Sequence, residues 1–303
     1  MKLVTYELNG AVKLGAVWGD GVVDLTAVAS DMLTLIAQGA AGLAAVEVVL
    51  ATETAVSTPL SELRLLAPIP NPRRNVMCLG LNYAEHAIES YAAKGRQASL
   101  PTTPIIFTKA TTAVSGPYDP IPFDTAVSSE IDWEVELAII IGKQGKNIPA
   151  EEALEYVFGY TVLNDISARD LQMNGKQYFK GKSLDGACPT GPWIVTPDEL
   201  DAPQNLRITS RVNGETKQDG NTRFMIFDIP AIIAYLSKGM TLLPGDIIAT
   251  GTPEGVGFAR TPPEFLRPGD VLESEVAGIG VLRNVVTAVS TPTSFVEKNT
   301  KTS

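Results

Sequence analysis

Alternating acidic and apolar residues in one thirteen-residue segment constrain the fold of this chain more than any other feature. The segment Glu130–Gly142 reads EIDWEVELAIIIG. Its first half alternates with a period of two and its second half is apolar, which indicates a β-strand that runs from a polar region into a hydrophobic core. On such a strand Glu134 and Glu136 point in the same direction, roughly 7 Å apart along the chain.

Carboxylates aligned on one face of a strand repel each other, and burial would raise their pKa values. A chain accepts this arrangement when the face is fully solvated or when a cation binds to it. A solvated acidic edge strand is therefore one explanation. Because the strand passes directly from its carboxylates into an apolar run, we favour the wall of a pocket that binds a metal ion.

Charge and composition limit the classes of partner. The formal net charge is −10 and the sequence has no basic run, so nucleic acid is not an expected partner. The apolar stretch at residues 32–51 contains Gln38 and Glu47, which indicates an amphipathic helix and not a membrane span. The spacing of Cys78 and Cys188 suggests neither a zinc site nor a disulfide framework, and the first ten residues lack the apolar core of a signal peptide. We expect a cytoplasmic protein without membrane association.

Turn and proline signals divide the chain into two predicted domains. Three short strands with Gly-containing turns, followed by the helical stretch, indicate a small α/β module. Pro68, Pro70 and Pro72 then mark a boundary, so we predict an accessory domain over residues 1–70 and a catalytic domain over 71–303. The larger domain is rich in strands and turns, and we expect an α+β fold. Its short helices are expected at 149–158 and 228–238.

The single histidine, His86, is a candidate general base. A lone histidine is often incidental. Here Glu89 follows three residues later, so the two side chains would share one face of a helix. A carboxylate that orients an imidazole is what a general base requires. The polar residues that end the segment 84–100 are typical of a mobile lid.

Two further regions have both a structural and a functional explanation. The run GTPEGVG at 251–257 lacks the Lys-Ser/Thr of a phosphate loop, so it is either a tight turn or a backbone wall that a ligand approaches closely. Several charged and polar residues follow Asp165. Each could be a surface residue, but together, after a candidate metal ligand, they could hold an anionic substrate: Arg169, Asp170, Gln172, Lys180 and Lys182.

Seven motifs in the order and spacing of one known family add to these observations. From about Asn75 to Val286 the chain resembles the fumarylacetoacetate hydrolase family in CLGLNYAEHAIE, PIIFTKATTAVSGP, IDWEVELAIIIG, GYTVLNDISARDLQ, FKGKSLDGACPTGPWI, VNGETKQ and LLPGDIIATGTPEGVG. The resemblance implies a β-rich mixed sandwich or roll. The N-terminal module resembles the accessory domain of many bacterial members.

The resemblance also implies roles for individual residues. A divalent cation, Mg²⁺ or Mn²⁺, would be held by Glu134, Glu136 and Asp165, and oxygen ligands suit such hard cations. Asp132 shares the strand face but matches no family ligand, so we expect it to support the ligands. The positions that match catalytic residues are His86, Glu89 and Lys182. The positions that match substrate-binding residues are Arg169, Gln172, Lys109, Gly251 and Thr252.

Three functions are compatible with such a site. Our first expectation is metal-dependent hydrolysis of a carbon–carbon bond in a 1,3-diketo acid of the acylpyruvate type, with the 2-oxo acid chelated and the pair His86 and Glu89 activating water. The alternative is a decarboxylase or isomerase acting on oxaloacetate or a 2-hydroxy-dienedioate at the same metal. A non-catalytic metabolite-binding protein is the third. The partner in each case is a small-molecule 2-oxo acid, and the resemblance implies a homodimer.

Overall fold

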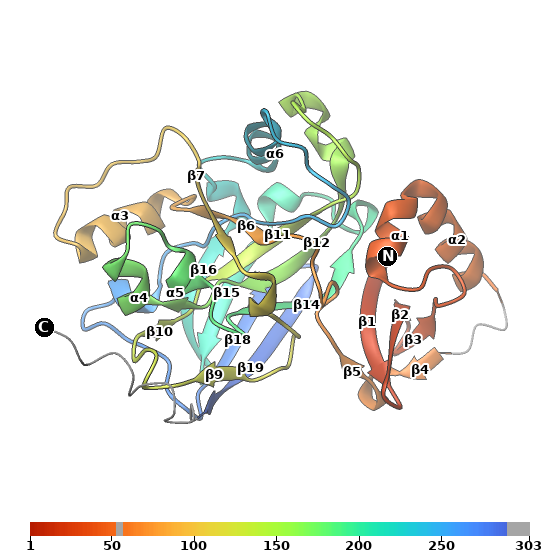
Figure 1. Cartoon of the computed structure of the whole chain (residues 1–303), viewed down its shortest axis with the longest axis horizontal. Helices are drawn as coiled ribbons and strands as arrows, with labels where there is room; N and C mark the ends of the chain where they lie inside the picture. The colour runs from red at the N-terminus through yellow and green to blue at the C-terminus, as the bar shows by residue number, and fades with distance from the viewer. Residues whose placement is uncertain (53–56, 290–303) are drawn as a thin grey trace, which may run out of the picture.

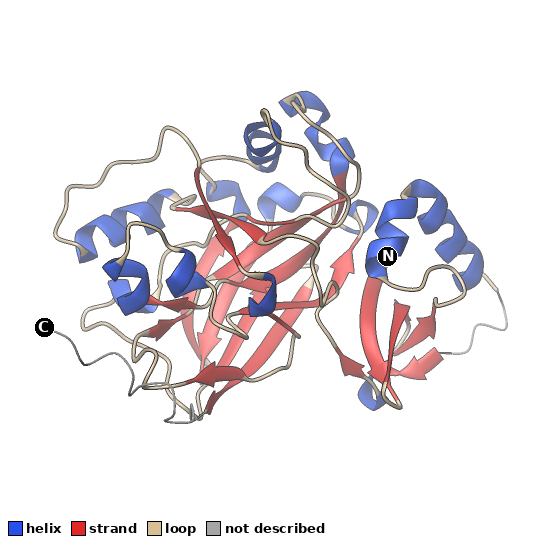
Figure 2. Ribbon diagram, in the orientation of Figure 1, coloured by secondary structure: helices blue, strands red, loops and turns tan. Residues whose placement is uncertain are grey.

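The computed structural model describes residues 1–52 and 57–289, and its main feature is one large mixed sheet (Figure 1). Figure 2 shows strands through the middle of the molecule and most helices around the outside. The path of hydrogen-bonded strands across this sheet is β4 (Ser57–Pro59), β3 (Gly21–Asp24), β2 (Ala11–Trp18), β1 (Lys2–Leu8), β14 (Cys188–Val195), β12 (Val157–Asn164), β11 (Val135–Ile141), β17 (Ile247–Ala249), β6 (Val76–Gly80) and β7 (Ile105–Lys109). Off this path, β5 (Arg64–Leu65) pairs with β1 and β8 (Val114–Ser115) with β14.

A second sheet packs against the first, and the remaining elements lie around both. Its strands in spatial order are β16 (Glu215–Asn221), β15 (Arg207–Val212), β18 (Val271–Val276), β19 (Gly280–Ala288) and β9 (Ile121–Phe123). A short ladder joins β10 (Ile131–Asp132) to β13 (Ser167–Ala168). The α-helices are α1 (Met32–Gln38), α2 (Ala40–Leu50), α3 (Ala84–Ala93), α4 (Arg169–Asn174), α5 (Phe179–Lys182) and α6 (Ile229–Ser237). The expected α+β class is confirmed.

Strand β11 lies between two hydrophobic cores. Val135, Leu137 and Ile139 face the core that contains α6 and residues of the second sheet, whereas Ala138 and Ile140 face the core that contains α1. All seven residues of β11 are buried. Burial on both faces explains why the acidic segment ends in an uninterrupted apolar run.

The predicted acidic strand is continuous in sequence but forms two pieces. β10 and β11 are separated by Trp133 and Glu134. At the break the backbone N–H of Glu134 donates to Asn164 Oδ1 at 3.0 Å, and the Trp133 indole N–H donates to the Gly255 carbonyl at 3.2 Å. At Trp133 and Glu134, hydrogen bonds that involve side chains therefore replace the regular backbone pairing of a strand.

The two predicted domains share a sheet and a core. β1 pairs with β14 through Lys2 with Val195 and Leu3 with Ile194, so the N-terminal strands extend the large sheet. One core also takes residues from both sides of the predicted boundary. The boundary at residue 70 stays a prediction, and residues 290–303 of the predicted catalytic domain lie outside the described range.

The helices differ from expectation at two of three places. The helix expected at 32–51 is two helices, α1 and α2, because Gly39 between them adopts φ 56°, which helical residues do not. The helix expected at 149–158 is a 3₁₀-helix, Ala150–Tyr156. The helix expected at 228–238 is confirmed as α6, with Asp228 as its N-cap. Within the described residues no single helix has the length and apolar character for a membrane span. The pair α1 and α2 together has that length and composition, but the two helices are bent by 112° relative to each other.

We predict that both faces of β11 contribute to stability. Ile139→Ala and Ile140→Ala remove buried methyl groups from different cores, so each should lower the free energy of unfolding by about 2–5 kcal/mol. Val12→Ala, at a side chain that is 59% exposed, is the control and should change little. Denaturant unfolding measures all three. A near-zero effect at Ile140 alone would contradict a core on that face.

Candidate active site

Three carboxylates converge where β11 begins and β12 ends. Glu134 precedes β11, Glu136 lies on it, and Asp165 follows β12, whose antiparallel register places Asn164 opposite Val135. The backbone N–H of Asp165 donates to the Glu134 carbonyl at 2.8 Å. One oxygen from each carboxylate lies within 4.8 Å of the others, and all three side chains are buried. The structure therefore brings the three predicted metal ligands together.

Three cations surround this triad and bind two of its members. Lys182 Nζ lies 2.7 Å from Glu134 Oε2 and 2.8 Å from Asp165 Oδ2. Lys109 Nζ lies 2.5 Å from Asp165 Oδ1, and Arg169 Nη2 lies 2.7 Å from Glu134 Oε1. Every oxygen of Glu134 and Asp165 thus has a cationic partner.

In the described part of the chain, Glu136 is the triad carboxylate without a cationic partner. Its Oε2 accepts the backbone N–H of Gly251 at 2.6 Å, and its Oε1 has no hydrogen-bond partner among the described residues. Gly251 has φ 96°, and a Cβ there would lie 2.8 Å from the Cβ of Asn82, so this contact requires glycine.

The electrostatics differ between the two glutamates. Burial raises the pKa of Glu134, but Lys182 and Arg169 outweigh burial and hold the pKa below its ordinary value. Burial, and then the negative charges of Asp165 and Glu134, raise the pKa of Glu136 well above its ordinary value. Glu136 is therefore the group that gains most from an added positive charge.

The residues present fit a hard divalent cation. The donor set consists of carboxylate oxygens, which Mg²⁺ and Mn²⁺ prefer, and it includes the unpartnered oxygen of Glu136. With Asp132, four buried carboxylates face three cations, so the cluster carries a formal charge of −1. A divalent ion would change this to +1, and one bound carboxylate anion would then balance it.

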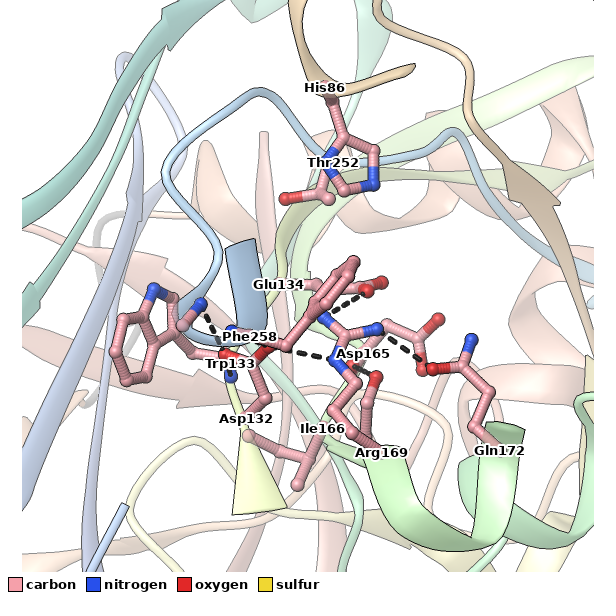
Figure 3. Close-up of polar contacts among 12 residues, drawn as sticks. His86, Asp132, Trp133, Glu134, Asp165, Ile166, Arg169, Gln172, Thr252 and Phe258 are labelled. Carbon is pink, nitrogen blue, oxygen red and sulfur yellow. Dashed lines mark hydrogen bonds and ion pairs between the residues drawn. The ribbon is translucent and has the colours of Figure 1, made fainter. Parts of the chain in front are cut away.

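Asp132 supports the site from the side opposite the triad. Its carboxylate accepts Arg169 Nε at 2.7 Å and the backbone N–H groups of Gly257 and Phe258 at 2.7 and 3.0 Å. The Arg169 guanidinium in turn lies 4.3 Å from the ring centre of Phe258 and donates to Gln172 Oε1 at 2.9 Å. Asp132 thereby fixes the arginine that binds Glu134, as Figure 3 shows.

The glycine-rich run at 251–257 is a loop whose amides bind carboxylates. Gly251 binds Glu136, Gly257 binds Asp132, and the N–H of Gly255 donates to Glu89 Oε2 at 2.9 Å. Glycines let the backbone approach each acid closely. The run is thus a backbone wall, although the acids that it holds belong to the chain itself.

His86 and Glu89 form the expected pair on α3. His86 Nδ1 lies 2.8 Å from Glu89 Oε1, and Glu89 is also held by Gly255. His86 is 5% exposed and lines a pocket together with Glu134 and Lys182. The contact at Nδ1 leaves Nε2 available for a ligand in that pocket.

The pocket separates the predicted substrate-binding residues into two groups. Arg169, Gln172 and Thr252 line it. Lys109 and Gly251 instead contact Asp165 and Glu136. A direct contact between these two residues and substrate stays a prediction.

The motifs and the site geometry agree with a family comparison. The family model described as "Fumarylacetoacetate (FAA) hydrolase C-terminal" matches residues 75–287. The chain belongs to this family. It is a metal-site enzyme of the FAA hydrolase type.

Relatives of this FAA hydrolase family member are named for different activities. The oxaloacetate tautomerase YisK of Bacillus subtilis is 50% identical over 75% of this chain and 74% of its own length. A mitochondrial oxaloacetate tautomerase of Bos taurus is 46% identical over 88% of this chain and 84% of its own length. A solved fumarylacetoacetate hydrolase from Exiguobacterium antarcticum has a TM-score of 0.82 and 41% identity, covering 95% of this chain and all of its own. A maleylpyruvate hydrolase from Sphingobium sp. SYK-6, solved with manganese(II) and pyruvate, has a TM-score of 0.79 and 33% identity. The match covers 95% of this chain and 99% of the hydrolase chain.

Sequence reasoning did not assign roles to several residues of this FAA hydrolase site. Asn164 holds the backbone of Glu134 and donates to Ser274 Oγ at 2.6 Å. Phe258 stacks on Arg169, and Lys94 lines the pocket. Asn164 adjoins a predicted ligand, which is a usable signal. Phe258 and Lys94 depend on contacts across the fold that no local pattern reveals.

We predict opposite effects of Glu136→Gln with and without metal. Without metal the substitution removes a carboxylate that faces two others, and an amide N–H₂ can donate to them, so stability should rise by about 1 kcal/mol. Mn²⁺ at about 100 times its dissociation constant should stabilise the unmodified protein by about 2.7 kcal/mol and the variant not at all. Thermal unfolding with chelator or Mn²⁺ measures both, with exposed Glu62→Gln as the control. A variant that keeps the Mn²⁺ increment would exclude Glu136 as a ligand.

We predict that Asp132→Asn destabilises the fold, although Asp132 is not one of the three triad carboxylates. Breaking the buried pair with Arg169 should lower the free energy of unfolding by about 3–5 kcal/mol. Asp219→Asn breaks the exposed pair with Arg207 and should have little effect. Denaturant unfolding of both variants measures the difference, and equal small effects would contradict the role of Asp132.

Proposed function

We propose that this enzyme catalyses the metal-dependent keto–enol tautomerisation of oxaloacetate or a closely related 2-oxo acid. Our first expectation was carbon–carbon bond hydrolysis. Similarity to two oxaloacetate tautomerases, one at 50% identity, supports the isomerase alternative better. The observation in the structure that carries the proposal is the placement of a carboxylate-oriented imidazole, His86, in the same pocket as Glu134 and Lys182.

The residues of this pocket suit a proton transfer between carbon and oxygen. A divalent ion held by Glu134, Glu136 and Asp165 would polarise the 2-oxo group and acidify the neighbouring carbon. His86, kept in one orientation by Glu89, would take the proton from that carbon and return it to the carbonyl oxygen. One C–H bond breaks and one O–H bond forms, so the reaction needs no other reactant. The Lys182 ammonium would stabilise the negative charge that develops on the oxygen.

Hydrolysis of an acylpyruvate is the second candidate. The structural similarity to a maleylpyruvate hydrolase supports it. In that reaction His86 would take the proton from water and not from carbon, with the other residues unchanged. Carbon–carbon cleavage yields two products, whereas tautomerisation yields one, so product analysis separates the candidates.

We predict that the enzyme with Mn²⁺ or Mg²⁺ accelerates exchange of the C3 hydrogens of oxaloacetate in D₂O, followed by NMR. His86→Ala should lower this rate about 10²–10⁴-fold because the base is lost. The exchange rate of Glu89→Gln, which keeps a hydrogen-bonding side chain, should lie between those of the wild type and His86→Ala. Chelator should abolish the activity of the wild type.

Three results would overturn parts of this proposal. Cleavage of acylpyruvates without faster C3 exchange would assign the hydrolase activity. A full exchange rate in metal-stripped enzyme would remove the metal from the reaction. A full rate in His86→Ala would remove the imidazole as the base.

The cellular setting rests on the sequence. We propose a homodimer in the cytoplasm with a small-molecule 2-oxo acid as ligand, and without nucleic acid or membrane partners. The net charge of −10 supports the exclusion of nucleic acid. Size-exclusion chromatography with light scattering tests the dimer.

A further inference from the structure

The rim of the pocket carries a cation that the proposed chemistry does not use. Lys94 follows the last turn of α3, and its side chain lines the pocket with His86 and Phe258. Its ammonium lies 5.8 Å from the ring centre of Phe258. No carboxylate among the described residues forms an ion pair with it, whereas Arg169 and Lys182 are each bound to two carboxylates.

The surroundings of Lys94 favour an incoming anion. Although the side chain as a whole is exposed, the protein around its ammonium partly excludes water, and this burial, with the positive charge of Arg169, lowers the pKa of Lys94. A cation that has lost hydration and faces another cation gains more from a carboxylate than a fully solvated lysine does.

The pocket between the triad and Lys94 suits an uncharged carbon chain. Its walls include Phe107, Met173, Tyr178 and Phe258, which offer apolar or aromatic surface. The pocket thus has cations beside Glu134, namely Arg169 and Lys182, a further cation at Lys94, and apolar or aromatic side chains among them. A molecule with a carboxylate at each end matches this distribution.

We propose that Lys94 binds the second carboxylate of a dicarboxylic substrate whose 2-oxo acid end lies at Glu134, Glu136 and Asp165. This inference rests on the proposed function, because it assumes that the 2-oxo acid end binds at the metal. Lys94 is then the residue that selects oxaloacetate-like dicarboxylates over 2-oxo acids with one carboxylate.

Two inert probes that differ by one distal carboxymethyl group test this assignment. Oxamate has the metal-chelating end alone, and N-oxalylglycine has the same end with an added carboxymethyl group. Titration calorimetry of each probe into the Mn²⁺-loaded protein measures binding without turnover. The wild type should bind N-oxalylglycine about tenfold more tightly than oxamate, as expected for one charge-assisted hydrogen bond.

The variants separate a direct contact from a general field. Lys94→Met should lose the tenfold preference and keep the oxamate affinity, and Lys94→Arg should retain the preference. Arg96→Met removes a positive charge two residues away, at a position outside the pocket lining, and should leave both affinities unchanged. This variant is the matched control for long-range attraction.

Each other outcome overturns the inference in a recognisable way. An unchanged preference in Lys94→Met, an equal loss for both probes, or an equal effect of Arg96→Met would each exclude Lys94 as the distal carboxylate site. Equal wild-type affinities for both probes would exclude the site but leave metal chelation intact. A wild type that binds neither probe with Mn²⁺ present would refute the proposed function, and this inference with it.

Discussion

Burial of four carboxylates in one small volume is the condition on which the rest of this structure depends. Asp132, Glu134, Glu136 and Asp165 are at most 5% exposed, and isolated charges in such surroundings would be strongly destabilising. The compensating cations come from separate elements, Lys109 from β7, Arg169 from α4 and Lys182 from α5. Each ion pair therefore also links its element to the large sheet, so the same contacts balance the charge of the site and stabilise the fold.

The glycine-rich loop also compensates buried carboxylates, with backbone N–H groups instead of cations. Its amides bind Glu136 of the triad, Asp132 behind Arg169, and Glu89 on α3. One loop thereby connects Glu136 of the triad, the Asp132 that holds Arg169, and the Glu89 that contacts His86. A phosphate loop uses glycines to bring N–H groups to a ligand. Here the same geometry binds the acids of the protein itself, and the loop fixes the pair of His86 and Glu89 relative to the carboxylate triad.

The sequence was sufficient for some parts of the site and insufficient for others, for physical reasons. Strand periodicity identified Glu134 and Glu136, because the alternation is local. Asp165 was a candidate ligand from its place after a predicted strand, but its grouping with Glu134 and Glu136 required the family resemblance, since their proximity depends on the register of β11 with β12. The contacts of Asp132 reach residues 257 and 258, which no local pattern indicates. Likewise, Gly39 divides a predicted helix through its positive φ, and Asn164 interrupts a predicted strand through a side-chain hydrogen bond.

A site of this kind can serve more than one reaction because its parts are not specific to one. The chain has a single histidine, so proton removal from carbon or from water would fall to the same imidazole. In both proposed reactions the triad and its cations would act on the 2-oxo acid end, which both classes of substrate share. The difference must therefore arise at the other end of the pocket, where the substrates differ. In the proposed binding mode that end has Lys94, which follows α3, and the nearby pocket lining includes Met173 of α4 and Phe258. Under the proposed function, selection between the two reactions would therefore depend on the residues that line this end of the pocket and not on the triad, because the triad is common to both reactions.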